Sequence, residues 1–145
     1  MKRNDLILLL VLLAGAAGFA LYARTPAASA SAAVSGEPEL IAATFNSQWC
    51  SACKILKPRL LKVMHDFADA PVKFVEYDLT FGPDRPRAAA AADGLASVYE
   101  RFSTATGYTL LIDAQTGAIV DRLTVNHSAA DMRRIIAARL AAASE

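Results

Sequence analysis

Cysteine and histidine are scarce in this chain, whose 145 residues include two cysteines and two histidines. A structural zinc site usually needs four such ligands, so it would have to use all of them together. An excess of one charge is also missing, because 15 Lys and Arg residues stand against 14 Asp and Glu residues and leave a net charge of +1. That balance gives no reason to expect nucleic acid or a strongly anionic partner.

The length and the start of the chain predict one globular domain behind a targeting segment. Lys2 and Arg3 precede an uncharged apolar run over residues 6–23, which is the layout of a secretory signal peptide or of an uncleaved signal anchor. Small-residue patterns favour cleavage, whereas a run close to the roughly 20 residues that span a bilayer favours retention. Both alternatives predict a periplasmic or other extracytoplasmic protein, and the second adds an anchor in the inner membrane.

Residues 24–38 are rich in Ala, Ser, Thr and Pro without apolar periodicity, which is typical of a flexible linker. The expected organisation is therefore a signal peptide or anchor over residues 1–23, a linker over residues 24–38 and a folded domain over residues 39–145. No internal repeat is visible.

Hydrophobic periodicity predicts a strand, a helix and a second strand at the start of the domain. The run over residues 40–45 is apolar and β-permissive and ends shortly before the two cysteines. From Cys53 to Phe67 apolar residues recur at helical spacing, with a kink expected at Pro58. Residues 72–78 alternate in β-prone fashion and predict the second strand.

Glycine, proline and capping signals divide the second half of the domain. Residues 80–86 are expected to form a loop, and residues 88–102 to form one broken helix or two short ones. Two β-rich runs over residues 109–113 and 118–125 predict a hairpin, and a capping box at residues 128–131 opens a final helix. The order β-α-β-α-β-β-α predicts an α/β fold with a mixed four-stranded sheet flanked by helices.

Cys50 and Cys53 are separated by two residues at the predicted strand-to-helix junction, and three roles compete for them. A structural disulfide would more often join distant segments, because closing a longer loop restrains the unfolded chain more. A metal site would need further ligands, for which His65 and His127 are the candidates. A redox dithiol needs one cysteine at a helix N-terminus and a second within reach, so the redox role is favoured and the other two stay open.

Placement at a helix N-terminus also predicts which thiol reacts. A free cysteine with a pKa near 8.5 is only about 3% ionised at pH 7, and a pKa of about 7 would raise that fraction to roughly half. Unpaired amides and the positive end of the helix dipole favour the Cys50 thiolate, with Lys54 and Lys57 adding positive charge. We expect Cys50 to attack a partner disulfide and Cys53 to resolve the mixed disulfide.

The run Trp49-Cys50-Ser51-Ala52-Cys53-Lys54, with Pro58 behind it and a strand in front, resembles the thioredoxin family. The resemblance extends over residues 40–140 in element order and implies a thioredoxin-like fold that works without a cofactor. It implies that Cys50 is the nucleophile, that Cys53 resolves, and that Trp49 flanks the dithiol as part of the catalytic and substrate-binding surface.

One departure from the family concerns the loop before the predicted hairpin. The family has a cis-proline there, and this chain has Tyr108 after Gly107. A cis bond before a non-proline residue costs about 3–4 kcal/mol, so the Gly107–Tyr108 peptide is expected to be trans. We expect Gly107 and Tyr108 to bind substrate in a manner that differs from the family's, or Tyr108 to pack over the dithiol. Because the proline also excludes metal ions in many members, its loss strengthens the metal alternative.

A second departure concerns proton transfer. The family's buried Asp, which accepts the proton of the resolving cysteine, is replaced by Thr44, and Glu76 lies where many members carry a lysine. We hypothesise that Glu76 is a catalytic, buried proton shuttle, since a partly buried carboxyl can have a raised pKa. The alternative is that Glu76 faces solvent, as most Glu residues do.

His127 and the segment over residues 80–92 complete the set of candidates. His127 follows the last predicted strand, in a loop that the resemblance brings near the dithiol, where it would stabilise a thiolate, bind metal or simply be solvated. The segment over residues 80–92 is longer than usual for the family and either shapes partner choice or is a neutral insertion.

These features predict an exported thiol-disulfide oxidoreductase that acts as a reductant rather than an oxidant. The expected partners are exported proteins with thiols or disulfides and a redox partner, with membrane association through residues 6–23 and no nucleic acid. No resident metal is assigned. The alternative is a metal-handling or assembly module that binds copper or zinc through Cys50, Cys53 and His127.

Overall fold

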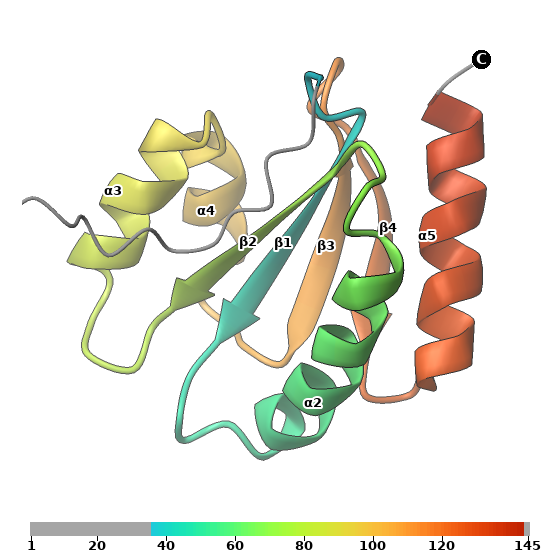
Figure 1. The fold of residues 1–145 in the computed structure, drawn as a ribbon. Coiled ribbons are helices and arrows are strands. Elements are labelled where there is room, and N and C mark those ends of the chain that lie inside the picture. Colours follow the sequence, from blue (N-terminus) through green and yellow to red (C-terminus); the bar gives the residue numbers. More distant parts are fainter. Residues whose placement is uncertain (1–35, 144–145) are drawn as a thin grey trace, which may run out of the picture. The chain divides into compact units, whose positions relative to one another are not determined.

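The computed structural model describes residues 36–143. The predicted targeting segment and residues 24–35 of the predicted linker lie outside the described residues. The elements follow in the order β1 (Leu40–Asn46), α2 (Ser51–Asp66), β2 (Val72–Asp78), α3 (Asp84–Ala92), α4 (Ala96–Phe102), β3 (Tyr108–Asp113), β4 (Ile119–Thr124) and α5 (Ala129–Ala143) (Figure 1). Over the described part of the chain, no helix has both the length and the apolar character needed to cross a membrane.

The four strands form one mixed sheet in the order β2-β1-β3-β4, which confirms the predicted α/β fold. β1 pairs parallel with β2 and antiparallel with β3, and β3 pairs antiparallel with β4. Every residue of β1 is buried, as a strand with neighbours on both sides and helices on both faces must be. Phe45 near the end of β1 pairs with Tyr108 at the start of β3, so these two strand ends meet where the chain leaves β1 for α2.

Helices cover both faces of the sheet (Figure 1). Leu40 and Ala42 of β1 belong to the core that α2 and α5 cover, whereas Ile41, Ala43 and Phe45 belong to the core beneath α3 and α4. This alternation follows from the two-residue period of a strand. Each fully buried aliphatic or aromatic side chain stabilises the fold by about 1.5–3 kcal/mol relative to exposure.

The predicted loop over residues 80–86 is too long, because α3 already begins at Asp84. Pro86 lies in the first turn of α3, where a missing amide proton costs no helical hydrogen bond. The helical segment predicted over residues 88–102 is divided between two helices, α3 and α4. The break contains Gly94 with a φ of +76°, a conformation that side chains other than glycine's rarely adopt.

The predicted capping box at the start of α5 is confirmed. The Asp131 amide donates to Ser128 Oγ at 3.2 Å, and the Ser128 amide donates to Asp131 Oδ2 at 3.1 Å. These bonds use amide donors that the first helical turn leaves without partners. They define how β4 is connected to α5 at the edge of the sheet that carries the dithiol.

Candidate active site

Cys50 is the N-cap residue of α2. Its backbone is extended, with φ −82° and ψ 112°, and its Sγ accepts a hydrogen bond from the Cys53 amide at 3.1 Å. Cys50 is partly exposed, whereas Cys53 is buried with 5% of its surface accessible, and both cysteines are free thiols. The strand-to-helix junction therefore presents one sulfur to solvent and holds the other beneath it.

Hydrogen bonding separates the two thiols chemically. Burial alone would raise the pKa of the Cys50 thiol, but hydrogen bonds from the Cys53 and Thr106 side chains and from the Cys53 and Ala52 amides outweigh it and lower that pKa. The pKa of the Cys53 thiol is raised, first by burial and then by its side-chain hydrogen bond to Cys50. Cys50 is therefore the thiol that ionises first, and Cys53 is the thiol that keeps its proton.

The loop that enters β3 packs against the dithiol. A β-carbon placed on Gly107 would lie 3.1 Å from Cys50 Sγ and 2.7 Å from Ala52 Cβ, and Gly107 has a φ of +95°. Its amide donates to the Phe45 carbonyl oxygen at 2.8 Å, which holds the loop to the end of β1. Only a residue without a side chain fits this close approach in this conformation.

Tyr108 follows in a trans peptide, as predicted, since the described residues contain no cis peptide bond. Its side chain is buried in the core beneath α3 and α4, where it stacks on Phe45 at 5.4 Å between ring centroids. The Tyr108 hydroxyl donates to the Phe102 carbonyl oxygen at 2.5 Å, and the Arg122 guanidinium lies 4.8 Å from the centre of the ring. The expectation that Tyr108 packs over the dithiol is wrong, because the ring occupies the face of the sheet opposite α2.

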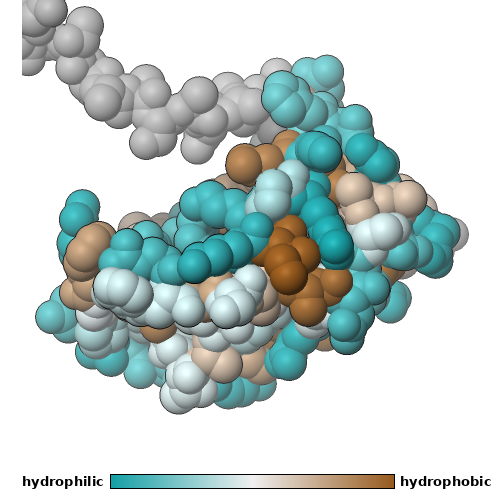
Figure 2. All heavy atoms as spheres, turned by 90° about the horizontal axis from the view of Figure 1, so that it is seen from below, coloured by the Kyte–Doolittle hydropathy of each residue, from teal (hydrophilic) through white to brown (hydrophobic). Residues whose placement is uncertain are grey.

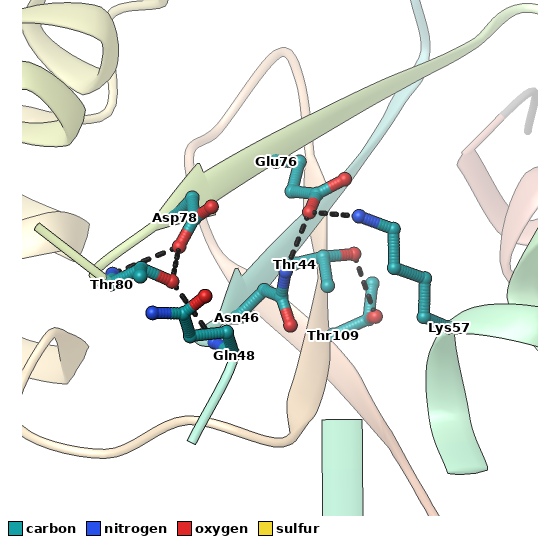
Figure 3. A network of polar contacts seen from close by, with 8 residues as sticks. All are labelled: Thr44, Asn46, Gln48, Lys57, Glu76, Asp78, Thr80 and Thr109. Atoms are coloured by element: carbon teal, nitrogen blue, oxygen red, sulfur yellow. Dashed lines mark hydrogen bonds and ion pairs between the residues drawn. The ribbon is translucent and has the colours of Figure 1, made fainter. Parts of the chain in front are cut away.

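Glu76 lies at the surface, so the expectation of a buried carboxyl is wrong. Its side chain is 42% exposed, and Oε1 accepts hydrogen bonds from Lys57 Nζ and from Asn46 Nδ2, each at 2.7 Å (Figure 3). On the buried side of the same register, the Thr44 and Thr109 hydroxyls are 2.9 Å apart and hydrogen-bonded. Thr44, which stands where the family has a buried Asp, is therefore paired with another hydroxyl.

The family comparison agrees with this geometry. The sequence profile of the thioredoxin family, described as Thioredoxin, matches residues 25–91, which include the dithiol. The fold of the chain is thioredoxin-like. Among proteins of curated function, none is similar enough in sequence to match.

The chain is also similar to solved structures at low sequence identity. A thiol:disulfide interchange protein of the thioredoxin family from Chlorobium tepidum is 20% identical, with 76% of this chain and 84% of that chain covered and a TM-score of 0.48. StoA from Bacillus subtilis is 14% identical, with 70% and 84% covered and a TM-score of 0.47. Thioredoxin-2 of a malaria parasite is 18% identical, with 68% and 82% covered and a TM-score of 0.47.

The thioredoxin-like dithiol is flanked by an exposed aromatic side chain. Trp49 is 73% exposed, and the residue before it, Gln48, donates its amide to Thr80 Oγ1 at 2.9 Å. That hydroxyl and the Asp78 carboxylate are hydrogen-bonded in turn, so the loop before the dithiol is tied to the loop after β2 (Figure 3). Figure 2 views the domain from the end where β1 stops and α2 begins, and it shows an apolar patch surrounded by hydrophilic side chains.

His127 is fixed by the backbone of its own loop. The Thr124 amide donates to His127 Nδ1 at 3.0 Å, and Arg59 of α2 donates to the Val125 and His127 carbonyl oxygens at 2.8 and 3.1 Å. Over residues 36–143, no three His, Cys, Asp or Glu side chains gather as metal ligands would. The predicted set of two cysteines and His127 is therefore not brought together as a three-ligand site.

Two residues of the site, Asn46 and Thr106, escaped the sequence analysis, and so did the pairing of Lys57 with Glu76. Asn46 and Lys57 donate hydrogen bonds to Glu76, and a side-chain hydrogen bond from Thr106 acts to lower the pKa of both thiols. Thr106 had one available signal, since it directly precedes the glycine of the loop expected to approach the dithiol. Its role depends on the φ of Gly107, which places the loop against the start of α2.

Proposed function

We propose that this chain is an exported thiol-disulfide oxidoreductase in which Cys50 is the nucleophile and Cys53 the resolving thiol. The observation that carries the proposal is the N-cap geometry, in which the partly exposed Cys50 Sγ accepts the Cys53 amide at 3.1 Å while Cys53 stays buried. A thiolate is the attacking species in disulfide exchange, and this hydrogen bond favours it. A thioredoxin-like fold with this pair supports oxidoreductase activity in general.

We propose that the dithiol acts as a reductant. A dithiol is more oxidising when the protein stabilises its reduced form, chiefly through the thiolate. Stabilisation of a thiolate is confined to one sulfur, because hydrogen bonds lower the pKa of the Cys50 thiol whereas burial raises the pKa of the Cys53 thiol. The Cys53 thiol therefore adds no thiolate stabilisation to the reduced form, which supports transfer of electrons from the dithiol to a partner disulfide.

The proposed partners are exported proteins with disulfides and a redox protein that restores the dithiol. The support for export is the N-terminal pattern of Lys2 and Arg3 before the apolar run over residues 6–23. The exposed Trp49 beside the partly exposed Cys50 supports a protein rather than a small molecule as the substrate, since aromatic side chains dominate protein contacts.

Reduction of insulin by the full chain, recycled by a dithiol, tests the activity, and Cys50→Ser is the control. We expect turnover that disappears in Cys50→Ser and stops at a trapped mixed disulfide in Cys53→Ser. An equilibrium titration against glutathione tests the direction, for which we expect a potential more negative than that of glutathione. Absence of cysteine-dependent turnover, with bound copper or zinc that survives dialysis and needs both cysteines, would favour the metal-handling role instead.

A further inference from the structure

Arg101 and Arg122 approach the same aromatic ring. The guanidinium carbon of Arg101 lies 5.7 Å from the centre of the Phe102 ring, and that of Arg122 lies 5.6 Å from it. Arg122 also lies 4.8 Å from the centre of the Tyr108 ring. Aromatic faces attract positive charge at such distances, so the rings at the end of α4 and the start of β3 hold two arginine side chains in place.

Neither guanidinium has a carboxylate partner within residues 36–143. Other arginine side chains of this part of the chain do form ion pairs with Asp or Glu, namely Arg87, Arg133, Arg134 and Arg139. Glu100, the acidic neighbour of Arg101 in the sequence, is the partner of Arg87. Arg101 and Arg122 are both exposed. Because two positive charges against one ring repel each other, an anion bound near both would relieve that repulsion.

The chemistry of the guanidinium group favours a carboxylate as that anion. A guanidinium is planar, and its five N–H groups spread outward in a fixed fork that attraction to a ring leaves largely unused. A carboxylate can accept two of these hydrogen bonds side by side. A side chain that is already held on a ring loses less conformational freedom on binding than a free one, so the two arginines are preorganised for such a ligand.

The two arginines lie at the end of the sheet that carries the dithiol. Tyr108 directly follows Gly107, whose missing β-carbon would lie 3.1 Å from Cys50 Sγ. The Tyr108 hydroxyl donates to the Phe102 carbonyl oxygen at 2.5 Å, which fixes one ring relative to the other. β4 is an edge strand of the sheet, so no further strand of the described domain shields Arg122 from a partner. A protein whose disulfide reaches Cys50 would bring its neighbouring residues to this surface.

We propose that Arg101 and Arg122 form a docking site for Asp or Glu side chains that lie close to the disulfide of a partner protein. The near balance of charge over the whole chain conceals this local excess of positive charge. Complementary charge at an interface speeds association and selects among partners more than it adds affinity. The inference rests on the exchange reaction proposed above and adds to it a class of substrate.

Two peptide dimers test the site in the full chain. In each dimer, one disulfide joins two copies of a short peptide, and the copies carry fluorophores that quench each other until the disulfide is reduced. The residues that flank the cysteine are Glu in one dimer and Gln in the other. Turnover in the presence of a recycling dithiol gives kcat and KM for both dimers.

The unchanged chain should have a KM for the Glu dimer about tenfold lower than for the Gln dimer, the size expected for two exposed ion pairs. Arg101→Gln and Arg122→Gln should each remove roughly a threefold share of this preference, and the double variant should remove it, with the change in KM rather than in kcat. Salt at about 0.5 M should also remove it. Arg85→Gln is the matched control, because Arg85 is exposed on α3 and its loss changes the net charge equally, and it should keep the preference.

Equal KM values for the two dimers in the unchanged chain would overturn the inference. So would an equal loss of preference in Arg85→Gln and Arg122→Gln, which would assign it to net charge, or a KM that rises equally for both dimers, which would mark a structural role. Weaker binding of the double variant to vesicles of phosphatidylcholine and phosphatidylglycerol, with the Glu preference intact, would assign the arginines to an anionic membrane instead. If neither dimer is reduced in a Cys50-dependent way, the proposed function fails as well.

Discussion

Gly107 lies directly against Cys50, although the two residues are far apart in the sequence. A β-carbon on Gly107 would be 3.1 Å from Cys50 Sγ and 2.7 Å from Ala52 Cβ. A side chain at position 107 would therefore have to move either the thiol or the start of α2. This contact places the loop before β3 at the reacting sulfur, and it makes Gly107 a direct test of the site's geometry.

Replacement of Gly107 by alanine should disturb the thiol as well as the fold. Gly82 supplies a matched control, since it has a φ of +106° and open space around its missing β-carbon. Each alanine should lower the free energy of unfolding by about 1–2 kcal/mol because of the positive φ. Only Gly107→Ala should also change the rate at which Cys50 reacts with iodoacetamide. An unchanged rate in Gly107→Ala, measured beside urea denaturation of both variants, would contradict this contact.

The two thiols should titrate in a set order. The pKa of the Cys50 thiol is lowered and that of the Cys53 thiol is raised from the ordinary value of a cysteine. Because the thiolate is the reactive form, alkylation of Cys50 in Cys53→Ser should rise with pH and level off at a lower pH than alkylation of Cys53 in Cys50→Ser. Rates measured across pH check the order, and a reversed order would argue against Cys50 as the nucleophile.

Trp49 should contribute to substrate binding and little to stability. Its side chain is 73% exposed, so Trp49→Ala should change the free energy of unfolding by no more than about 0.5 kcal/mol. The KM for insulin should rise several-fold, while the reaction of Cys50 with a small disulfide stays the same. Phe81, which is 88% exposed in the loop after β2, supplies the comparison. An equal rise of KM in Phe81→Ala would show that exposed aromatic area in general, rather than Trp49, is responsible.

Arg59 should stabilise the contact between α2 and the loop that joins β4 to α5. It donates to the Val125 and His127 carbonyl oxygens at 2.8 and 3.1 Å. Arg59→Met removes a charged donor from both oxygens and should cost about 1–3 kcal/mol in urea denaturation. Lys62 is exposed on the same helix, and Lys62→Met should stay within about 0.5 kcal/mol. Equal losses in the two variants would remove the special role of Arg59.

The sequence by itself determined the features that depend on neighbouring residues. The spacing of Cys50 and Cys53, the apolar period of α2 and the alternation in β2 all act within a few positions, and so does the capping box at Ser128. Strand and helix periods follow from local backbone geometry, so the α/β order and the dithiol at a helix start could be predicted correctly.

Only the tertiary structure decided which distant side chains meet at the dithiol. Gly107 lies against Cys50 because the antiparallel register of β1 and β3 brings Phe45 opposite Tyr108, the residue that follows Gly107. Thr44 of β1 pairs with Glu76 of β2 on one side and with Thr109 of β3 on the other. The Glu76 side chain lies at the surface, where it forms an ion pair with Lys57. Such contacts depend on strand pairing over long sequence separations, which no local pattern encodes.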